Sequence, residues 1–341
     1  MKSTEFRNSE KSRYRQLKGK FLSAAATKNG TYPAGERYDF CIENDHSEEN
    51  LFKDIRSDAI SYFKQREIPW HDGIEKRTKP SNHLCCSQSC CVNFLFPVSD
   101  KCELISDIFR KFYPQLFIAQ TIEADGPLPN GSLPYVSFEW IGLEDYLGEL
   151  KRKQMKRTRG ANFTSADFIM RFKRNDGNTQ VVLGEWKYTE EYGRTDLGIE
   201  ARKKNYKIAF ERDERDGGVF IKPSDQLYDS LFFDPFYQLM RLQLLAQEME
   251  INHGMGADIV SVLHVSPKAN TGFRNHVTSP YLQEKYPGKG VLEIWETLVK
   301  PGSFKSISVE NLLTAINNAA ANKYADWVDY LNARYNWARS K

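Results

Sequence analysis

The sequence predicts an α/β fold: a central mixed sheet of four or five strands flanked by helices, with a helical N-terminal half packed on it. Two apolar runs on either side of residues 175–177 predict a β-hairpin. The nearly continuous apolar run at 257–265 is typical of a central strand buried on both faces. Residues 232–250 have the apolar spacing of a buried helix, and Pro235 stands where proline favours the start of one.

The other segments are assigned by the same patterns. They predict helices at 54–66, 85–98, 102–117, 143–155, 309–321 and 324–337, and a strand at 135–141. The chain then divides into a mainly helical region at 1–130, a core at 131–300 and C-terminal helices at 301–341. The highly charged stretch 193–228 is interpreted as an insertion or a mobile flap.

Composition limits the class of protein. At 341 residues and 40% hydrophobic, the chain can bury one large core or two modest ones. The net charge of +3 is too small to indicate nucleic-acid binding by itself. The first residues lack the apolar core of a signal peptide, and no run reaches the ~18 apolar residues of a membrane span, so we expect a soluble, cytoplasmic protein. Six cysteines, four of them bunched, do not form a secreted disulfide pattern.

Two acids and a lysine lie at the ends of the predicted hairpin strands. Asp167 begins the first strand, and Glu185 and Lys187 end the second. Because strand side chains alternate, Glu185 and Lys187 share a face and Trp186 takes the other. A three-residue loop with Gly177 in the left-handed conformation places Asp167 directly opposite Glu185. A two-residue loop would pair Asp167 with Trp186 instead, so the register is part of the prediction.

Two carboxylates and an ammonium on one sheet face favour a divalent cation. The two acids repel each other, and a cation removes that conflict. Mg²⁺ prefers oxygen and is held by one or two carboxylates plus substrate phosphate oxygens. The lysine beside the ion could orient a water or stabilise a pentacovalent phosphate. The alternative is a surface hairpin in which Glu185 and Lys187 form only a weak pair.

These residues resemble a known family. Asp167 followed by Glu185-Trp186-Lys187, on a hairpin after a helix that ends in a glutamate, resembles the core of the PD-(D/E)XK nuclease superfamily. The longer strings RTRGANFTSADFIMRF, LGEWKYTEEY and DPFYQLMRLQLLA resemble a group of bacterial proteins classed as restriction endonucleases, and NHLCCSQSCCVNFLFPV resembles a matching upstream segment. The resemblance covers about residues 70–270. Ala166 replaces the proline of the motif, a residue that does not contact the metal.

The resemblance implies a restriction-endonuclease-like core and a Mg²⁺-dependent DNA endonuclease, with Mn²⁺ as a substitute ion and 5′-phosphate products. Asp167 and Glu185 would bind the ion together with the backbone carbonyl of Trp186. Lys187 would position the attacking water and stabilise the developing charge.

A further acid often completes such a metal site from the first core helix. By this resemblance Glu149, 18 residues before Asp167, is the preferred candidate, and Glu144 and Glu139 are the competitors. Glu190 and Glu191 follow the second strand and are either outer ligands or solvated.

The charge distribution indicates where DNA would bind. Between residues 149 and 174 there are nine Lys or Arg and two acids, which suits a phosphodiester substrate, although a solvated basic helix face has the same pattern. In nucleases of this shape, the second core helix can also present Gln or Arg towards the phosphate. The predicted DNA-binding residues are Lys156, Arg157, Arg159, Gln238 and Arg241.

Two other classes of protein stay open. A nuclease-fold protein could bind nucleic acid or a protein partner without cutting. The bunched cysteines Cys85, Cys86, Cys90 and Cys91, with His83 nearby, could instead hold zinc, but they continue into an apolar helix in which cysteine behaves as a small hydrophobe. His264, near the end of a buried strand, is interpreted as structural. If both DNA strands are cut, a homodimer is favoured.

Overall fold

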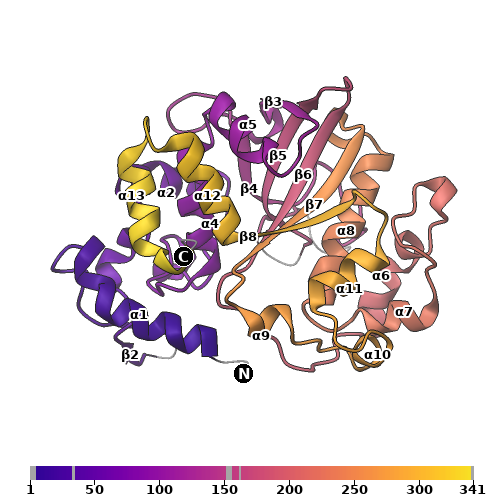
Figure 1. Cartoon of the computed structure of the whole chain (residues 1–341), viewed down its shortest axis with the longest axis horizontal. Helices are drawn as coiled ribbons and strands as arrows, with labels where there is room; N and C mark the ends of the chain where they lie inside the picture. Colours follow the sequence, from indigo (N-terminus) through magenta and orange to yellow (C-terminus); the bar gives the residue numbers. More distant parts are fainter. Residues whose placement is uncertain (1–4, 33–34, 151–155, 161–162, 339–341) are drawn as a thin grey trace.

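The structure, a computed structural model, describes residues 5–32, 35–150, 156–160 and 163–338. A mixed sheet of six strands forms its centre, with helices on both faces (Figure 1). The strands are β3 (Leu116–Gln120), β4 (Val136–Trp140), β5 (Ala166–Arg174), β6 (Thr179–Trp186), β7 (Ile259–Ser266) and β8 (Phe304–Ser308). The predicted α/β class with a central mixed sheet is confirmed, with six strands where four or five were expected.

Strand β5 organises the antiparallel part of the sheet. Strands β3 and β4 lie one after the other along one edge of β5, and β6 pairs with the opposite edge. Strands β7 and β8 extend the sheet parallel to β6. The start of β5 and the end of β6 therefore meet in the middle of the sheet, beside the carboxyl end of β7.

Each face of the sheet has its own hydrophobic core and its own layer of helices, which Figure 1 shows on opposite sides of the strands. The core on one face includes residues of α4 (Ser87–Leu95), α5 (Cys102–Arg110), α12 (Val309–Ala320) and α13 (Ala325–Arg334). The core on the other face includes residues of α6 (Glu200–Phe210), α7 (Asp225–Ser230), α8 (Phe236–Ile251) and α11 (Val291–Leu298). The chain thus forms a three-layer α/β/α arrangement.

Local sequence signals explain where the main helices begin. Pro235 is the N-cap of α8, and 12 of the 16 residues of this helix are buried, as expected for a central core helix. Helix α12 begins after Ser308, whose Oγ accepts the backbone N–H of Asn311 at 3.1 Å. Helices α12, α4, α13 and α2 (Arg56–Gln65) lie within the predicted ranges, and α8 ends at Ile251, one residue beyond the range predicted for it.

The remaining helices and strands complete the description of the chain. They are α1 (Glu5–Phe21), β1 (Gly30–Thr31), β2 (Arg37–Tyr38), α3 (Ile74–Arg77), α9 (Thr271–Arg274) and α10 (Pro280–Lys285). Segments of 3₁₀ helix lie at Asn44–Asn50, Lys53–Ile55, Phe96–Val98, Glu123–Asp125, Glu214–Asp216, Gly254–Gly256 and Asn336–Ala338. None of the described helices has both the length and the apolarity to cross a membrane.

The helix predicted at 143–155 is wrong over its described part. Residues 143–150 form bends and turns, and 151–155 lie outside the described residues. Gly142 and Gly148 have φ values of 79° and 63°, a left-handed backbone that interrupts a helix. The carboxylate of Asp145 also accepts backbone N–H groups that follow it, which competes with helical hydrogen bonding.

Other boundaries differ from the prediction. The helix expected at 102–117 ends at Arg110, and the chain continues into β3. Because β3 precedes residue 131 and β8 follows residue 300, the sheet extends beyond both ends of the predicted core. In the stretch interpreted as an insertion or a flap, α6 packs on α8, and its Tyr206 and Phe210 are buried in the core.

Candidate nuclease site

The hairpin register brings Asp167 opposite Glu185. The backbone N–H of Arg174 donates to the carbonyl of Asn178 at 2.9 Å, and Gly177 has a φ of 85°, as the three-residue loop requires. The paired positions run from Lys173 with Thr179 to Phe168 with Gly184, and the next pair in this register is Asp167 with Glu185. The predicted register is therefore confirmed. The Oδ2 atom of Asp167 also accepts the backbone N–H of Trp186 at 2.6 Å.

Glycine at position 184, one residue before Glu185, is required by close packing. A Cβ added to Gly184 would lie 2.1 Å from the ring of Phe168, which is fully buried against the partner strand. Phe168 in turn packs edge-on to Trp186, with ring centroids 6.4 Å apart. The glycine therefore lets the aromatic layer approach the strand that carries the site.

Lys187 and Glu185 share a face, as strand alternation predicts. The Nζ of Lys187 lies 2.6 Å from a carboxylate oxygen of Glu185 and donates to Oε1 of Gln238 at 2.7 Å. Gln238 lies on the first turn of α8, and Tyr192 hydrogen-bonds to the same amide. Trp186 points to the other face and packs against Phe94 with ring centroids 5.2 Å apart. The beginning of α8 thus holds the lysine against the sheet.

The electrostatics of this group are in conflict. Burial, and then the charge of Glu185, raise the pKa of Asp167 well above its ordinary value, while Lys187 opposes the shift. Burial alone would lower the pKa of Lys187, but Glu185, Tyr192 and Asp167 together raise it above its ordinary value. Asp234, which precedes α8, also has a raised pKa because it is buried. A single ammonium therefore faces more negative charge than it can balance.

A third acid lies beside Asp167: Glu139, one of the two competitors of Glu149. In the β4–β5 register Phe138 pairs with Phe168 and Trp140 with Ala166, which places Glu139 level with Asp167. Burial raises the pKa of Glu139, the hydrogen bonds from Gln88 and Ser165 lower it, and Glu185 raises it further.

The backbone at Glu139 is strained, with a φ of 50°. Gln88 Nε2 donates to its Oε1 at 2.7 Å, and the Ser165 hydroxyl donates to its Oε2 at 3.2 Å. Three carboxylates, those of Glu139, Asp167 and Glu185, therefore lie at matching positions on three adjacent strands.

Glu149 has different surroundings. Its carboxylate accepts the backbone N–H and the hydroxyl of Thr164, at 2.7 and 2.8 Å, and the hydroxyl of Tyr206 at 2.6 Å. Arg241 of α8 completes this group, with Nη2 3.3 Å from the carboxylate and Nε donating to the Thr164 hydroxyl. Glu149 thereby ties the loop before β5 to α6 and α8. Its assignment as a metal ligand stays a prediction.

All of the predicted DNA-binding residues contact other parts of the protein. Gln238 contacts Lys187, as described above, and Lys156 forms an exposed ion pair with Glu67. Arg157 donates to the carbonyls of residues 141 and 142, and Arg159 lies 2.6 Å from Asp125 in an ion pair. These two arginines, like Arg241, already bind protein groups, so their contact with DNA stays a prediction.

His264 is buried beside the site, and its imidazole forms no hydrogen bond with any described residue. It pairs with Glu185 across the β6–β7 register and with Ser306 across the β7–β8 register. Its ring stacks on Phe273 with centroids 5.3 Å apart, and neither ring nitrogen has a hydrogen-bond partner among the residues that the structure describes. Burial, and then the charge of Lys187, lower the pKa of His264 well below its ordinary value. A neutral imidazole therefore lies next to the three carboxylates of Glu139, Asp167 and Glu185, which we call the acidic row.

The cysteine cluster forms part of a core. Cys85, Cys86, Cys90 and Cys91 are buried at the start and along the length of α4, and none forms a disulfide. Burial raises the pKa of Cys90 to about 12, so its thiol stays protonated. Among the described residues, no three His, Cys, Asp or Glu side chains are placed to enclose a metal ion by themselves.

Helix α1 forms a buried hydrogen-bond network beside the site that the sequence did not predict. The hydroxyl of Tyr188, next to Lys187, donates to the buried carboxylate of Glu10 and lies 3.0 Å from the hydroxyl of Tyr14. Arg13 donates to the same carboxylate of Glu10 at 2.6 Å. The spacing of Glu10, Arg13 and Tyr14 on one turn could have indicated a buried polar face, but nothing local indicated its partner 178 residues away.

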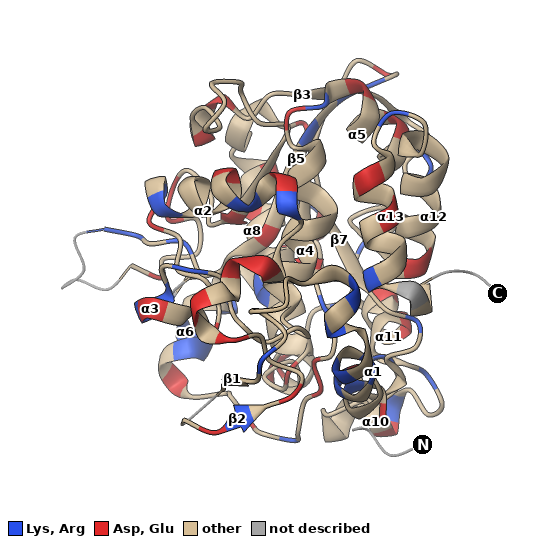
Figure 2. Cartoon of the chain, turned by 90° about the vertical axis from the view of Figure 1, so that its left-hand side faces the viewer, with Lys and Arg blue, Asp and Glu red and all other residues tan. Residues whose placement is uncertain are grey.

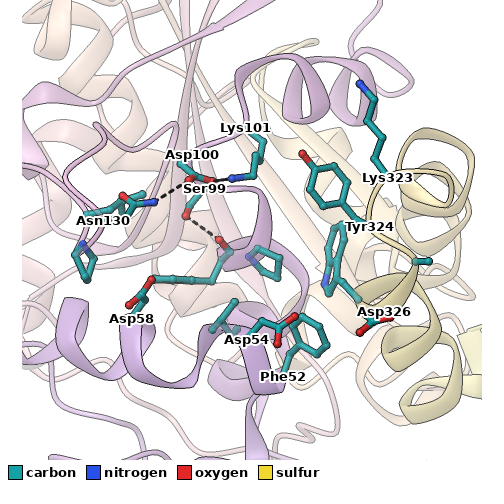
Figure 3. Close-up of a pocket in the computed structure, with 17 residues that line it drawn as sticks. Phe52, Asp54, Asp58, Ser99, Asp100, Lys101, Asn130, Lys323, Tyr324 and Asp326 are labelled. Atoms are coloured by element: carbon teal, nitrogen blue, oxygen red, sulfur yellow. Dashed lines mark hydrogen bonds and ion pairs between the residues drawn. The ribbon is translucent and has the colours of Figure 1, made fainter.

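A large cavity lies elsewhere, between α2, the turn before α5 and α13 (Figure 3). It has a volume of about 550 Å³, and its walls include Phe52, Asp58, Tyr324 and Asp326. None of the residues of the acidic row lines it. The cavity is therefore separate from the group at the hairpin.

Comparison with known proteins assigns the family. A family model described as "Restriction Endonuclease associating with ARP" matches residues 7–336. No match was found among curated proteins or among solved structures. The family match extends from α1 to just past the end of α13, well beyond the range of about 70–270 over which the sequence resembles restriction endonucleases. The chain belongs to this family of restriction endonucleases.

Proposed function

We propose that the protein is a Mg²⁺-dependent DNA endonuclease that hydrolyses phosphodiester bonds at Asp167, Glu185 and Lys187. The observation that carries the proposal is the register of the hairpin, which puts the two carboxylates on opposing positions with the lysine 2.6 Å from one of them. The family supplies the reaction class, because restriction endonucleases cut DNA.

The donor set fits a hard divalent ion. Asp167 and Glu185 supply carboxylate oxygens, and the raised pKa of Asp167 marks a charge conflict that a cation would relieve. Mg²⁺ is usually held by one or two carboxylates, with water and substrate phosphate as its other ligands, so a larger protein cage is not needed. The backbone carbonyl of Trp186 and the carboxylate of Glu139 are further candidate ligands, and Mn²⁺ would serve as a substitute. When bound, the ion would neutralise the phosphate and lower the pKa of a bound water.

The protein side chains have separate tasks in this proposal. Lys187 has an ammonium that can donate to the attacking water or to a non-bridging phosphate oxygen. Gln238 keeps this ammonium in place because its Oε1 accepts a hydrogen bond from the Lys187 Nζ at 2.7 Å. Asp167 keeps its orientation because the backbone N–H of Trp186 binds one carboxylate oxygen. Both contacts arrange the charged groups before the substrate arrives.

The experiment is cleavage of supercoiled plasmid by the purified chain with Mg²⁺, Mn²⁺, Ca²⁺ or a chelator. The expected result is nicked or linear DNA with Mg²⁺ or Mn²⁺ and none with the chelator. A Lys187→Ala preparation, purified in the same way, controls for contaminating nucleases. Equal cleavage by the parent chain and this variant would contradict the proposal, as would the absence of cleavage on plasmids of varied sequence and modification.

The same proposal favours a homodimer with one catalytic site in each chain. Cutting both strands of a duplex needs two catalytic groups, and a homodimer supplies them with one symmetric interface. Linear product formed without a nicked intermediate, together with a dimer mass in light scattering, is the outcome expected of a dimer.

A further inference from the structure

A second polar pocket lies next to the acidic row, beneath α1. It has a volume of about 270 Å³. Its walls come from Arg7 and Lys11 of α1, from Tyr32, from the segment around His71, from residues 81–87 up to the start of α4, and from Thr189 and Glu190 just after Lys187. The pocket therefore continues from the end of the strand that carries the candidate catalytic residues.

Direct contacts join this pocket to the site. The Nε of Arg7 donates to the carbonyl of Thr189 at 3.0 Å, so α1 rests on the chain just past Lys187. Gln88 connects the other side: its Oε1 accepts the backbone N–H of His71 at 2.7 Å, and its Nε2 donates to Glu139 at 2.7 Å. A single side chain, Gln88, therefore connects the wall of the pocket to Glu139 of the acidic row.

Among the described residues, only two of the six cations of α1, Arg13 and Arg15, form an ion pair with an acid. Helix α1 contains six Lys or Arg and two Glu, and Figure 2 shows the basic positions along it in blue. Arg15 pairs with Asp39, and Lys18 donates to the carbonyl of Cys41 at 2.5 Å. Arg7 and Lys11 are the two cations of α1 that line the pocket, and neither forms an ion pair with a described residue. Among the described residues the terminal guanidinium nitrogens of Arg7 have no hydrogen-bond partner, although the charge of Arg7 acts on the carboxylate of Glu191. The Nζ of Lys11 lies 4.5 Å from the ring centre of Phe40.

The acids that line the pocket are already engaged. Asp72 accepts the hydroxyl of Tyr32 at 2.6 Å and lies 3.4 Å from the imidazole of His71. Glu190 accepts the backbone N–H of Tyr188 at 2.5 Å. The charges of Lys11 and Arg7 also act on His83. Its pKa is lowered to about 4 by burial, then by Lys11 and, to a smaller extent, by Arg7, while Asp72 opposes the shift. The hydrogen bond with Cys86 raises the pKa of His71 in the same lining to about 9, so three cations face these two acids and the pocket suits an anion.

We propose that this pocket binds a backbone phosphate of the DNA strand, adjacent to the phosphate that is cut, through Arg7 and Lys11. The inference rests on the proposed function, since it needs DNA at the acidic row. A volume of about 270 Å³ lies below the roughly 300–1,000 Å³ of pockets for drug-sized ligands, and it suits one phosphate with its sugar. A guanidinium with two free nitrogens can bind such a phosphate with two parallel hydrogen bonds. Helix α1 would then be part of the DNA-binding surface.

The test is binding of a fluorescein-labelled DNA duplex, measured by anisotropy between about 0.05 and 0.2 M salt. All proteins carry Lys187→Ala, so the duplex stays intact. We expect Arg7→Gln with Lys11→Gln to weaken binding on the order of tenfold and to reduce the salt slope by about 2, and either change alone to reduce it by about 1. Lys20→Gln, on the exposed end of the same helix, is the matched control and should leave both quantities unchanged.

Each outcome is decisive. Because Arg7 also holds the carbonyl of Thr189, its replacement could disturb the fold, and Lys11→Gln, which removes no protein hydrogen bond, then carries the test. If the parent chain cuts DNA while the Arg7 and Lys11 variants keep the affinity and the salt slope of the Lys20 variant, the pocket assignment is overturned and the proposed function stands. If the duplex binds with the predicted slopes and no cation supports cutting by the parent, the phosphate pocket is supported and the proposed function fails.

Discussion

The carboxylate of Asp167 accepts the backbone N–H of Trp186, with 2.6 Å between Oδ2 and N. This bond crosses the hairpin and ties the aspartate to the strand segment that carries Glu185 and Lys187. It fixes the distance between two acids that would otherwise separate because they repel each other. The backbone therefore holds the acidic pair together, and a bound cation would find the pair already formed.

Gln238 should act by holding Lys187. Its amide oxygen lies 2.7 Å from the lysine Nζ, and the side chain is only half-buried, so its loss should not unfold the protein. We expect Gln238→Ala to lower kcat for plasmid cleavage by about 10–100-fold, the range for groups that orient catalytic residues, with little change in KM or in the thermal midpoint. Gln238→Glu, which keeps the acceptor, should retain more activity. Equal rates for the parent and the alanine variant would contradict this role.

Glu139 and Glu149 should respond differently to the same substitution. Glu139→Gln removes a buried charge that is level with Asp167, so cleavage should fall about 10–100-fold while the thermal midpoint stays equal or rises. Glu149→Gln weakens the contact with Arg241, so the free energy of unfolding should fall by about 1–3 kcal/mol with the Mg²⁺ dependence of cleavage unchanged. Cleavage titrated against Mg²⁺ and urea unfolding of both variants provide the measurements. The reversed pattern would make Glu149 the ligand.

The hydroxyl of Tyr188 should stabilise the attachment of α1. Tyr188→Phe leaves the buried Glu10 and Tyr14 without this partner, so the free energy of unfolding should fall by about 1–3 kcal/mol. Urea unfolding is the measurement. The control is Tyr38→Phe, whose hydroxyl bonds to the exposed Glu36 and whose effect should stay within about 0.5 kcal/mol. Equal stability of the two variants would show that the buried network contributes nothing measurable.

The pKa of His83 should depend on the charge of Lys11, which lines the same pocket beneath α1. Its pKa is lowered to about 4, first by burial and then by Lys11, so Lys11→Gln should raise it and Lys20→Gln should not. NMR titration of the histidine ring protons measures both. Between the unfolded pKa of about 6.5 and the folded value, only the unfolded chain binds this proton, so the contribution of His83 to stability should decrease as the pH falls through that window. An unchanged pKa in the Lys11 variant would place the two groups too far apart to interact.

Features encoded over short distances could be predicted from the sequence. The hairpin register followed from the loop residues, because only a three-residue loop with Gly177 in the left-handed conformation aligns the acids. The shared face of Glu185 and Lys187 followed from strand alternation. The positions of α8 and α12 followed from the proline and serine at their starts.

Features that depend on distant contacts could not be predicted. Glu139 lies level with Asp167 only because β4 pairs with β5, and no local pattern distinguishes it from Glu149. The charged residues at 143–150 have helical spacing, but the left-handed backbone at Gly148 ends any helix there. Helix α1 contacts the site through Arg7 and Glu10, whose partners lie more than 170 residues further along the chain.

The most direct test of the central claim is a titration of Mn²⁺ into the complex of the chain with duplex DNA, followed by the electron paramagnetic resonance signal of the free ion. The chain carries Lys187→Ala so that the duplex is not cut. We predict that Mn²⁺ binds this complex and that Asp167→Asn with Glu185→Gln removes that binding while the duplex stays bound. Equal Mn²⁺ binding with and without the two carboxylates would contradict the account.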